Sequence, residues 1–183
     1  RHAASADAAA RRTSAALEAV FHAREDSFRA MLGAIDALGD DLSAISGLSP
    51  PEPRFEQDWF PRLDAAALYA LVRTRSPARI VEVGSGHSTR FVMRAVRDGG
   101  LAAEVTAIDP APRADLSGLP LTLVRAPLQE ADPSAFASLS AGDLLMVDSS
   151  HVLMPGTDVD IVLGHVLPAM PAGLLVGFHD IFL

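Results

Sequence analysis

The stretch Ile80-Val81-Glu82-Val83-Gly84-Ser85-Gly86-His87-Ser88-Thr89 decides the fold of this chain. Residues 80–83 are mostly apolar and β-branched, which favours a buried strand. The two glycines allow a tight turn in which the backbone can approach a ligand closely, and Ser88 or Thr89 can cap a following helix. A strand, a glycine turn and a helix in this order form a ligand-binding corner in open α/β sheets.

Beyond this turn, short apolar runs alternate with helical segments. The predicted strands are residues 80–83, 105–108, 121–124, 144–147 and 174–178. The predicted helices between them are residues 89–97, 133–139 and 158–167. Apolar strands that alternate with helices indicate a mostly parallel sheet covered on both faces, so we expect an α/β fold of three layers.

Two further regions precede the sheet. Residues 1–48 are rich in alanine and have apolar residues three or four positions apart, which predicts one long helix or two helices broken near Gly33 or Gly39. Residues 49–78 begin with a proline cluster that cannot continue a helix, and residues 64–74 then read as a covering helix. We expect residues 79–183 to form the core, and the helical region to pack on it or to join two copies as a homodimer.

The composition excludes several classes of protein. The chain has no cysteine, which excludes disulfides and thiolate metal sites, and its 15 basic residues are all arginine, which excludes a lysine Schiff base. The net charge of -8 argues against nucleic-acid binding, which needs a basic surface. No apolar stretch is long enough to span a membrane. The lack of cysteine also fits a reducing compartment, so we expect a cytoplasmic protein.

The glycine turn departs from the dinucleotide-binding pattern. That pattern is G-x-G-x-x-G, and Thr89 stands where its third glycine would be. Glu82, just before the glycines, would repel a pyrophosphate but can attract the cationic amino-acid end of S-adenosylmethionine, directly or through water. The turn therefore favours S-adenosylmethionine over NAD.

Polar residues at other strand ends complete the expected cofactor site. Asp109 ends the second predicted strand, about 20 residues beyond the glycine turn, where a carboxylate can accept hydrogen bonds from ribose hydroxyls. We expect the cofactor to contact Glu82, Gly84, Ser85, Gly86, Ser88, Asp109, Asp148 and Ser149.

Acids and histidines follow the fourth and fifth predicted strands, in Asp148-Ser149-Ser150-His151 and His179-Asp180. Parallel strands end at the same rim, so these side chains should lie close together. Three interpretations stay open. Asp148, His179 and Asp180 can hold a divalent metal; His151 or His179 can act as a general base without a metal; or His179 and Asp180 only cap the strand end.

Other residues near the expected site have two possible roles. His87 in the glycine turn either touches the methionine part of the cofactor or is exposed to solvent. Trp59, Phe55 and Phe60 either cover the pocket or anchor the amino-terminal helices. Pro127-Leu128-Gln129 falls where an adenine ring would lie.

The order of these motifs resembles a bacterial group of class I (Rossmann-like) S-adenosylmethionine-dependent methyltransferases over about residues 54–183. The resemblance rests on the segments Arg54…Trp59-Phe60…Asp64…Leu68-Tyr69, residues 82–89, Asp109-Pro110, residues 147–151 and residues 178–182. It implies that Gly84, Gly86 and Asp109 bind the cofactor. In the metal-dependent catechol-type relatives, acids after the fourth and fifth strands bind magnesium; the matching positions here are Asp148 and, by loose analogy, His179-Asp180.

The resemblance also implies a strand order. The complete fold has seven strands in the order 3-2-1-4-5-7-6, and this sequence stops after the fifth, so we expect the order 3-2-1-4-5. The apolar run at residues 174–178 would then be an exposed edge, unless a longer tail or a partner covers it.

Together these observations predict an S-adenosylmethionine-dependent methyltransferase that methylates an oxygen of a small-molecule or sugar-type acceptor. We expect neither nucleic acid nor membrane as a partner. Two alternatives stay open: a non-catalytic cofactor-binding or assembly module, and a nicotinamide-dependent oxidoreductase.

Overall fold

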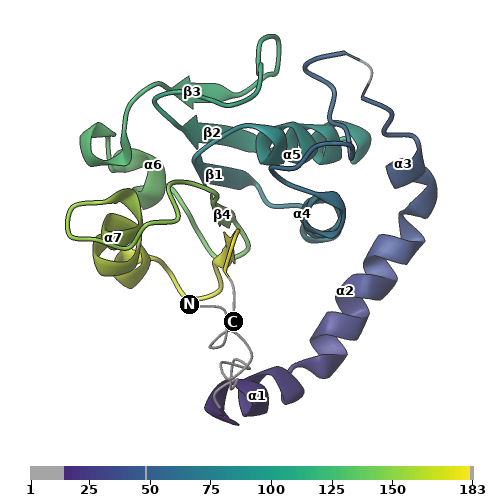
Figure 1. Cartoon of the computed structure of the whole chain (residues 1–183), viewed down its shortest axis with the longest axis horizontal. Helices are drawn as coiled ribbons and strands as arrows, with labels where there is room; N and C mark the ends of the chain where they lie inside the picture. The colour runs from purple at the N-terminus through teal and green to yellow at the C-terminus, as the bar shows by residue number, and fades with distance from the viewer. Residues whose placement is uncertain (1–14, 48, 182–183) are drawn as a thin grey trace, which may run out of the picture.

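The computed structural model describes residues 15–47 and 49–181. Within these residues the strands form one parallel sheet in the order β3-β2-β1-β4-β5, which confirms the predicted fold class and order (Figure 1). The first 14 residues of the predicted helical region, residue 48 and Phe182 lie outside the described part. The strands are β1 (Arg79–Val83), β2 (Glu104–Ile108), β3 (Thr122–Val124), β4 (Leu144–Val147) and β5 (Leu175–Phe178).

Helices cover both faces of this sheet and make three layers (Figure 1). On one face lie α4 (Arg62–Arg75) and α5 (His87–Asp98). The predicted helix at residues 158–167 is α7 (Asp158–Ile161), continued by the π-helical turn η2 (Val162–Val166) and the 3-10 turn η3 (Leu167–Ala169). This segment shares its face with η1 (Leu128–Glu130) and the short helix α6 (Ser134–Ala137).

The two faces of the sheet have separate apolar cores, because side chains alternate along a strand. Ile80 packs with Tyr69 and Phe91 beneath α4 and α5. Val81 and Val83 pack on the opposite face with residues of α6 and η2. Glu82 shares the α5 side with Ile80, and it is fully buried there. The strand that leads into the glycine turn is therefore buried on both faces, as its apolar character predicts.

The amino-terminal helices form an arm that reaches the core only at its carboxyl end (Figure 1). The helices are α1 (Ala15–His22), α2 (Glu25–Ala37) and α3 (Gly39–Ser43). The predicted break near Gly39 is confirmed at Leu38, but the predicted break at Gly33 is wrong, since one glycine weakens a helix without ending it. Ile35, Leu38, Leu42 and Ile45 pack into the core, whereas the apolar residues nearer the amino terminus are exposed, namely Leu17, Val20, Phe28 and Leu32. A homodimer contact through this arm stays a prediction.

The linker that follows the arm, which contains Glu52 and Phe55, contacts α5. Arg94 and Arg97 form ion pairs with Glu52, and the ring of Phe55 packs on Phe91 at 5.1 Å between centroids. β5 lies at one edge of the sheet, where Val176 is 42% exposed, so the expected apolar edge is present. Among the described residues, no helix is long and apolar enough to cross a membrane.

Candidate active site

A cavity of about 800 Å³ opens at the carboxyl ends of the strands, where ligands bind in open α/β sheets. Its wall consists of the loops that follow β1 to β5, together with the end of the linker. The lining residues are Trp59-Phe60, residues 83–87, residues 108–111 with Arg113, residues 127–129, residues 148–152, residues 155–158 and Asp180.

Gly84 is required by packing. It has a φ of +85°, and a Cβ built there would lie 1.8 Å from the carbonyl oxygen of Asp148. We expected both glycines to admit a ligand, but the close neighbour at Gly84 is the end of β4. Gly86 does face open space, since a Cβ there would find no atom closer than 3.8 Å. The turn therefore combines one glycine that fits the protein with one that leaves room in the cavity.

Glu82 and Thr89 stabilise the glycine turn through buried hydrogen bonds. The Thr89 hydroxyl donates to Glu82 Oε2 at 2.5 Å and accepts from the backbone N–H of Gly86 at 2.9 Å. Burial raises the pKa of Glu82 to about 7, and the negative charges of Asp148 and Asp109 add to this rise. Glu82 and Ser88 are fully buried and do not line the cavity. In this structure they lie beneath the loop, so Glu82 supports the cavity wall through Thr89.

Asp109 lies on the cavity wall beside the glycine turn. Its Oδ2 accepts a hydrogen bond from the Ser85 hydroxyl at 2.9 Å, and its Oδ1 accepts one from the Ala111 N–H at 2.7 Å. Each carboxylate oxygen retains an acceptor lone pair, so Asp109 can still bind a diol. Ile108 and Leu128 supply apolar surface next to it.

An acid–histidine cluster lies at the carboxyl ends of β4 and β5, and its members Asp148, His151 and Asp180 line the cavity. It consists of Asp64, Asp148, His151, His179 and Asp180. His179 is only 8% exposed, with its Nδ1 3.1 Å from Asp148 and its Nε2 3.5 Å from Asp64. Its ring packs on Phe60 at 4.7 Å, and it does not line the cavity. His179 is thus held behind the wall by two carboxylates.

His151 is the histidine of this cluster that lines the cavity. Its Nε2 lies 3.4 Å from Asp148 and 3.6 Å from Asp180. Its φ is +59°, and that of Asp180 is +55°, so both residues adopt the left-handed conformation that costs energy in residues other than glycine. Strain of this kind is often found at functional sites.

Three members of the cluster have ligand atoms close enough for one metal ion. The available atoms of Asp148, His151 and His179 all lie within 4.8 Å of one another. The expected set had Asp180 in place of His151, and the Asp180 carboxylate lies 3.6–3.7 Å from the two histidines. Two imidazoles with one carboxylate suit zinc, manganese or iron better than magnesium.

Sequence reasoning missed two residues of the site, Arg113 and Asp64. Arg113, in the irregular loop after β2, lies over the ring of Trp59 at 4.4 Å, and both line the cavity mouth. Trp59 lines the cavity and is 60% exposed, whereas Phe60 is buried against His179. Asp64 was part of a recognised motif without an assigned role. Only the fold brings it to His179, so no local signal in the sequence could have revealed this pairing.

A parallel α/β sheet with a glycine loop and a strand-end acid around one cavity defines a Rossmann-like ligand-binding protein. A scan against family models matched residues 81–181 to a methyltransferase domain. A search of curated proteins found no match, and neither did a search of solved structures. Because the matched segment covers more than half of the chain, the chain belongs to the class I S-adenosylmethionine-dependent methyltransferase family. This assignment favours a methyltransferase over a nicotinamide-dependent oxidoreductase.

Proposed function

We propose that this methyltransferase uses S-adenosylmethionine to methylate an oxygen of a small molecule. The observation that carries the proposal is one cavity that is lined by the glycine loop, Asp109 and His151. When bound, the cofactor supplies an electrophilic methyl group on its sulfonium.

The residues present fit this cofactor. The open space at Gly86 leaves room for a ligand against the loop, and Asp109 retains lone pairs for the two ribose hydroxyls. Ile108 and Leu128 offer apolar surface to the adenine ring. The volume of about 800 Å³ lies within the range of small-molecule sites, which supports an acceptor of small size.

His151 is the residue we assign to the acceptor proton. A hydroxyl is a poor nucleophile until its proton is removed, and an imidazole at the cavity wall can accept that proton at Nε2 or Nδ1. The carboxylates of Asp148 and Asp180 lie on the Nε2 side of the ring and stabilise the imidazolium that forms. General-base catalysis by such a group contributes about 10²- to 10⁴-fold in rate.

Cofactor binding and methyl transfer are tested separately. Calorimetry should show binding of S-adenosylhomocysteine and no binding of NAD. Labelled S-adenosylmethionine and a panel of catechols and sugars should then reveal transfer, and His151→Ala should lower kcat by about 10²-fold or more. The matched control is His165→Ala, since His165 is exposed on η2 and does not line the cavity. Binding of NAD would refute the cofactor. Tight cofactor binding without transfer to any acceptor would favour the non-catalytic module.

A divalent cation is a second candidate for the acid–histidine cluster, favoured by the proximity of Asp148, His151 and His179. These three residues would hold the ion, which would lower the pKa of an acceptor hydroxyl. Metal analysis of the purified protein and calorimetry with zinc or manganese test this candidate. Specific binding that Asp148→Asn abolishes supports it. Full activity after chelation, with no metal retained, refutes it.

A further inference from the structure

The loop after β4 presents three consecutive apolar side chains to solvent. Val152, Leu153 and Met154 are 45%, 64% and 60% exposed, and they directly follow His151. Single exposed apolar residues are normal on a protein surface, but a contiguous run of three is a liability unless it binds something. Val152 lines the cavity, so this run begins at the cavity itself.

Hydrogen bonds hold this loop in a defined conformation. At its start, the backbone N–H of Ser150 donates to Asp158 at 3.0 Å, and the Ser150 hydroxyl bonds the same carboxylate. At its end, the Thr157 hydroxyl lies 2.7 Å and 2.8 Å from the carbonyl oxygens of Val152 and Met154. Compact surface loops that are held together in this way are often functional. Because the polar groups of the loop bond within it, the exposure of its apolar side chains is a fixed property of its conformation.

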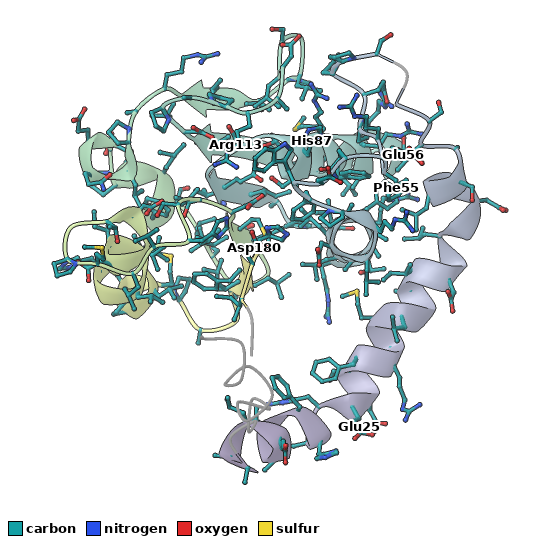
Figure 2. The ribbon with its side chains drawn as sticks, in the orientation of Figure 1. Glu25, Phe55, Glu56, His87, Arg113 and Asp180 are labelled. Atoms are coloured by element: carbon teal, nitrogen blue, oxygen red, sulfur yellow. The ribbon has the colours of Figure 1, made fainter. Side chains whose placement is uncertain are left out.

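Two apolar side chains from other loops extend this surface around the cavity. Trp59 is exposed and lines the cavity. Ile181 is exposed and follows Asp180, whose carboxylate lies 3.6 Å from His151 Nε2, so Ile181 and the run after His151 flank this pair. Asp180, labelled in Figure 2, lies just beyond the end of β5 and lines the cavity. We call Trp59, residues 152–154 and Ile181 the apolar rim.

The apolar rim adjoins the residue that we assign to the acceptor proton. A peptide bond joins Val152 to His151, whereas the surfaces that we assign to ribose and adenine come from other segments, namely Ile108, Asp109 and Leu128. An acceptor whose hydroxyl lies at the His151 ring therefore has the apolar rim within reach of the rest of its body. The rim is thus continuous with the acceptor part of the cavity.

We propose that the methyl acceptor is an amphiphile, with a hydroxyl-bearing head in the cavity and an alkyl or aryl body on the apolar rim. This inference rests on the proposed function and narrows its class of acceptor. The carboxylates and the imidazole of Asp148, His151 and Asp180 suit a polar head, and an apolar body would remove the rim from water. A free sugar would leave the rim in water. A second copy of the chain could also cover the rim, so the experiment must distinguish these two occupants.

Calorimetry on the protein saturated with S-adenosylhomocysteine tests the proposal without an identified acceptor. The probes are two series with different heads, 4-alkylphenols and n-alkyl β-glucosides, each from methyl to hexyl and below the concentration at which micelles form. Each buried methylene strengthens binding by up to about fourfold, so in at least one series the hexyl member should bind at least about tenfold more tightly than the methyl member. In the double variant Leu153→Ser/Met154→Ser this gain should fall below about threefold, because the apolar surface of the rim is reduced.

The matched control is Leu163→Ser, because Leu163 is exposed on η2 and does not line the cavity. This variant should retain the full gain with chain length. Three results would each overturn the inference: no gain in either series, a gain that the double variant retains, or an equal loss in Leu163→Ser.

Analytical ultracentrifugation of the wild type and the double variant tests the other occupant. A wild-type dimer that Leu153→Ser/Met154→Ser dissociates would assign the apolar rim to a second copy and would also overturn the inference. Failure of the proposed function is distinguishable from these results, because the wild type would then not bind S-adenosylhomocysteine in the first titration, before any amphiphile is added.

Discussion

Glu82→Gln should gain stability relative to the wild type as the pH rises from about 4 to about 8. Glu82 is fully buried, and burial raises its pKa from 4.5 to about 7. In the unfolded chain the carboxyl ionises near its ordinary pKa, whereas in the folded protein it keeps its proton to about neutral pH. Between these two values the folded state binds more protons than the unfolded state, so rising pH destabilises the wild type.

The size of this effect follows from the interval between the two pKa values. Each pH unit in that interval costs about 1.4 kcal/mol, so the wild type loses about 3 kcal/mol between pH 4.5 and about 7 on account of this residue. Below pH 4.5 both states are protonated and the contribution of Glu82 to stability is fully present. Glutamine cannot ionise, so the variant lacks this loss.

Urea unfolding of both proteins at several pH values measures the difference. The glutamine amide beside Thr89 changes the free energy of unfolding by an amount that does not depend on pH. It therefore leaves the slope of the free energy of unfolding against pH unchanged. Other titrating groups are common to both proteins and cancel in the difference. Parallel stability curves from pH 4 to pH 8 would show that Glu82 is ionised in the folded protein, and the account of a buried, protonated acid beneath the glycine turn would be wrong.

Three further predictions concern other parts of the structure. Gly84→Ala should lower the free energy of unfolding, measured with urea, by at least about 3 kcal/mol, and Gly118→Ala should lower it by only about 1 kcal/mol. Both glycines have a positive φ (+85° and +81°), but only at Gly84 would the added Cβ collide with another backbone. Equal losses in the two variants would contradict this contact. Trp59 is the only tryptophan, so binding of S-adenosylhomocysteine should change the intrinsic fluorescence of the protein. Arg113→Ala should change the fluorescence of the ligand-free protein, because the guanidinium lies over the Trp59 ring. An unchanged spectrum in both experiments would argue against the position of these two residues at the cavity. Tyr69→Phe should cost about 1–2 kcal/mol, since the Tyr69 hydroxyl donates a hydrogen bond to Asp98 and accepts one from Arg73, both partly buried. A loss below about 0.5 kcal/mol would show that these bonds contribute little to stability.

The sheet could be predicted from the sequence because its strands are short apolar runs that alternate with helical segments along the chain. Each strand lies within one residue of its predicted bounds, for instance β2 at Glu104–Ile108 against the predicted 105–108. The turn at residues 23–24 between α1 and α2 could not be predicted, because the sequence has no glycine or proline there. The π-helical turn η2 likewise depends on how Val162 and Val166 pack beneath the sheet, which is a tertiary effect.

The site was predictable to the extent that topology determines it. Parallel strands end at one rim, so Gly84, Asp109, Asp148 and His151 could be brought together without a structure. The sequence could not indicate which side of the cavity wall each side chain would occupy. His179 and His151 looked equivalent, yet His179 turns inward between two acids and Phe60.

The contact of Gly84 with the carbonyl group of Asp148 joins the two halves of the cavity mechanically. The backbone of the glycine turn lies directly against the backbone of Asp148, a member of the acid–histidine cluster, without a side chain between them. A side chain at position 84 would have to displace the backbone of Asp148, and with it the carboxylate that lies 3.4 Å from His151 Nε2. A substitution in the glycine turn would therefore disturb the acid–histidine cluster as well as the turn itself.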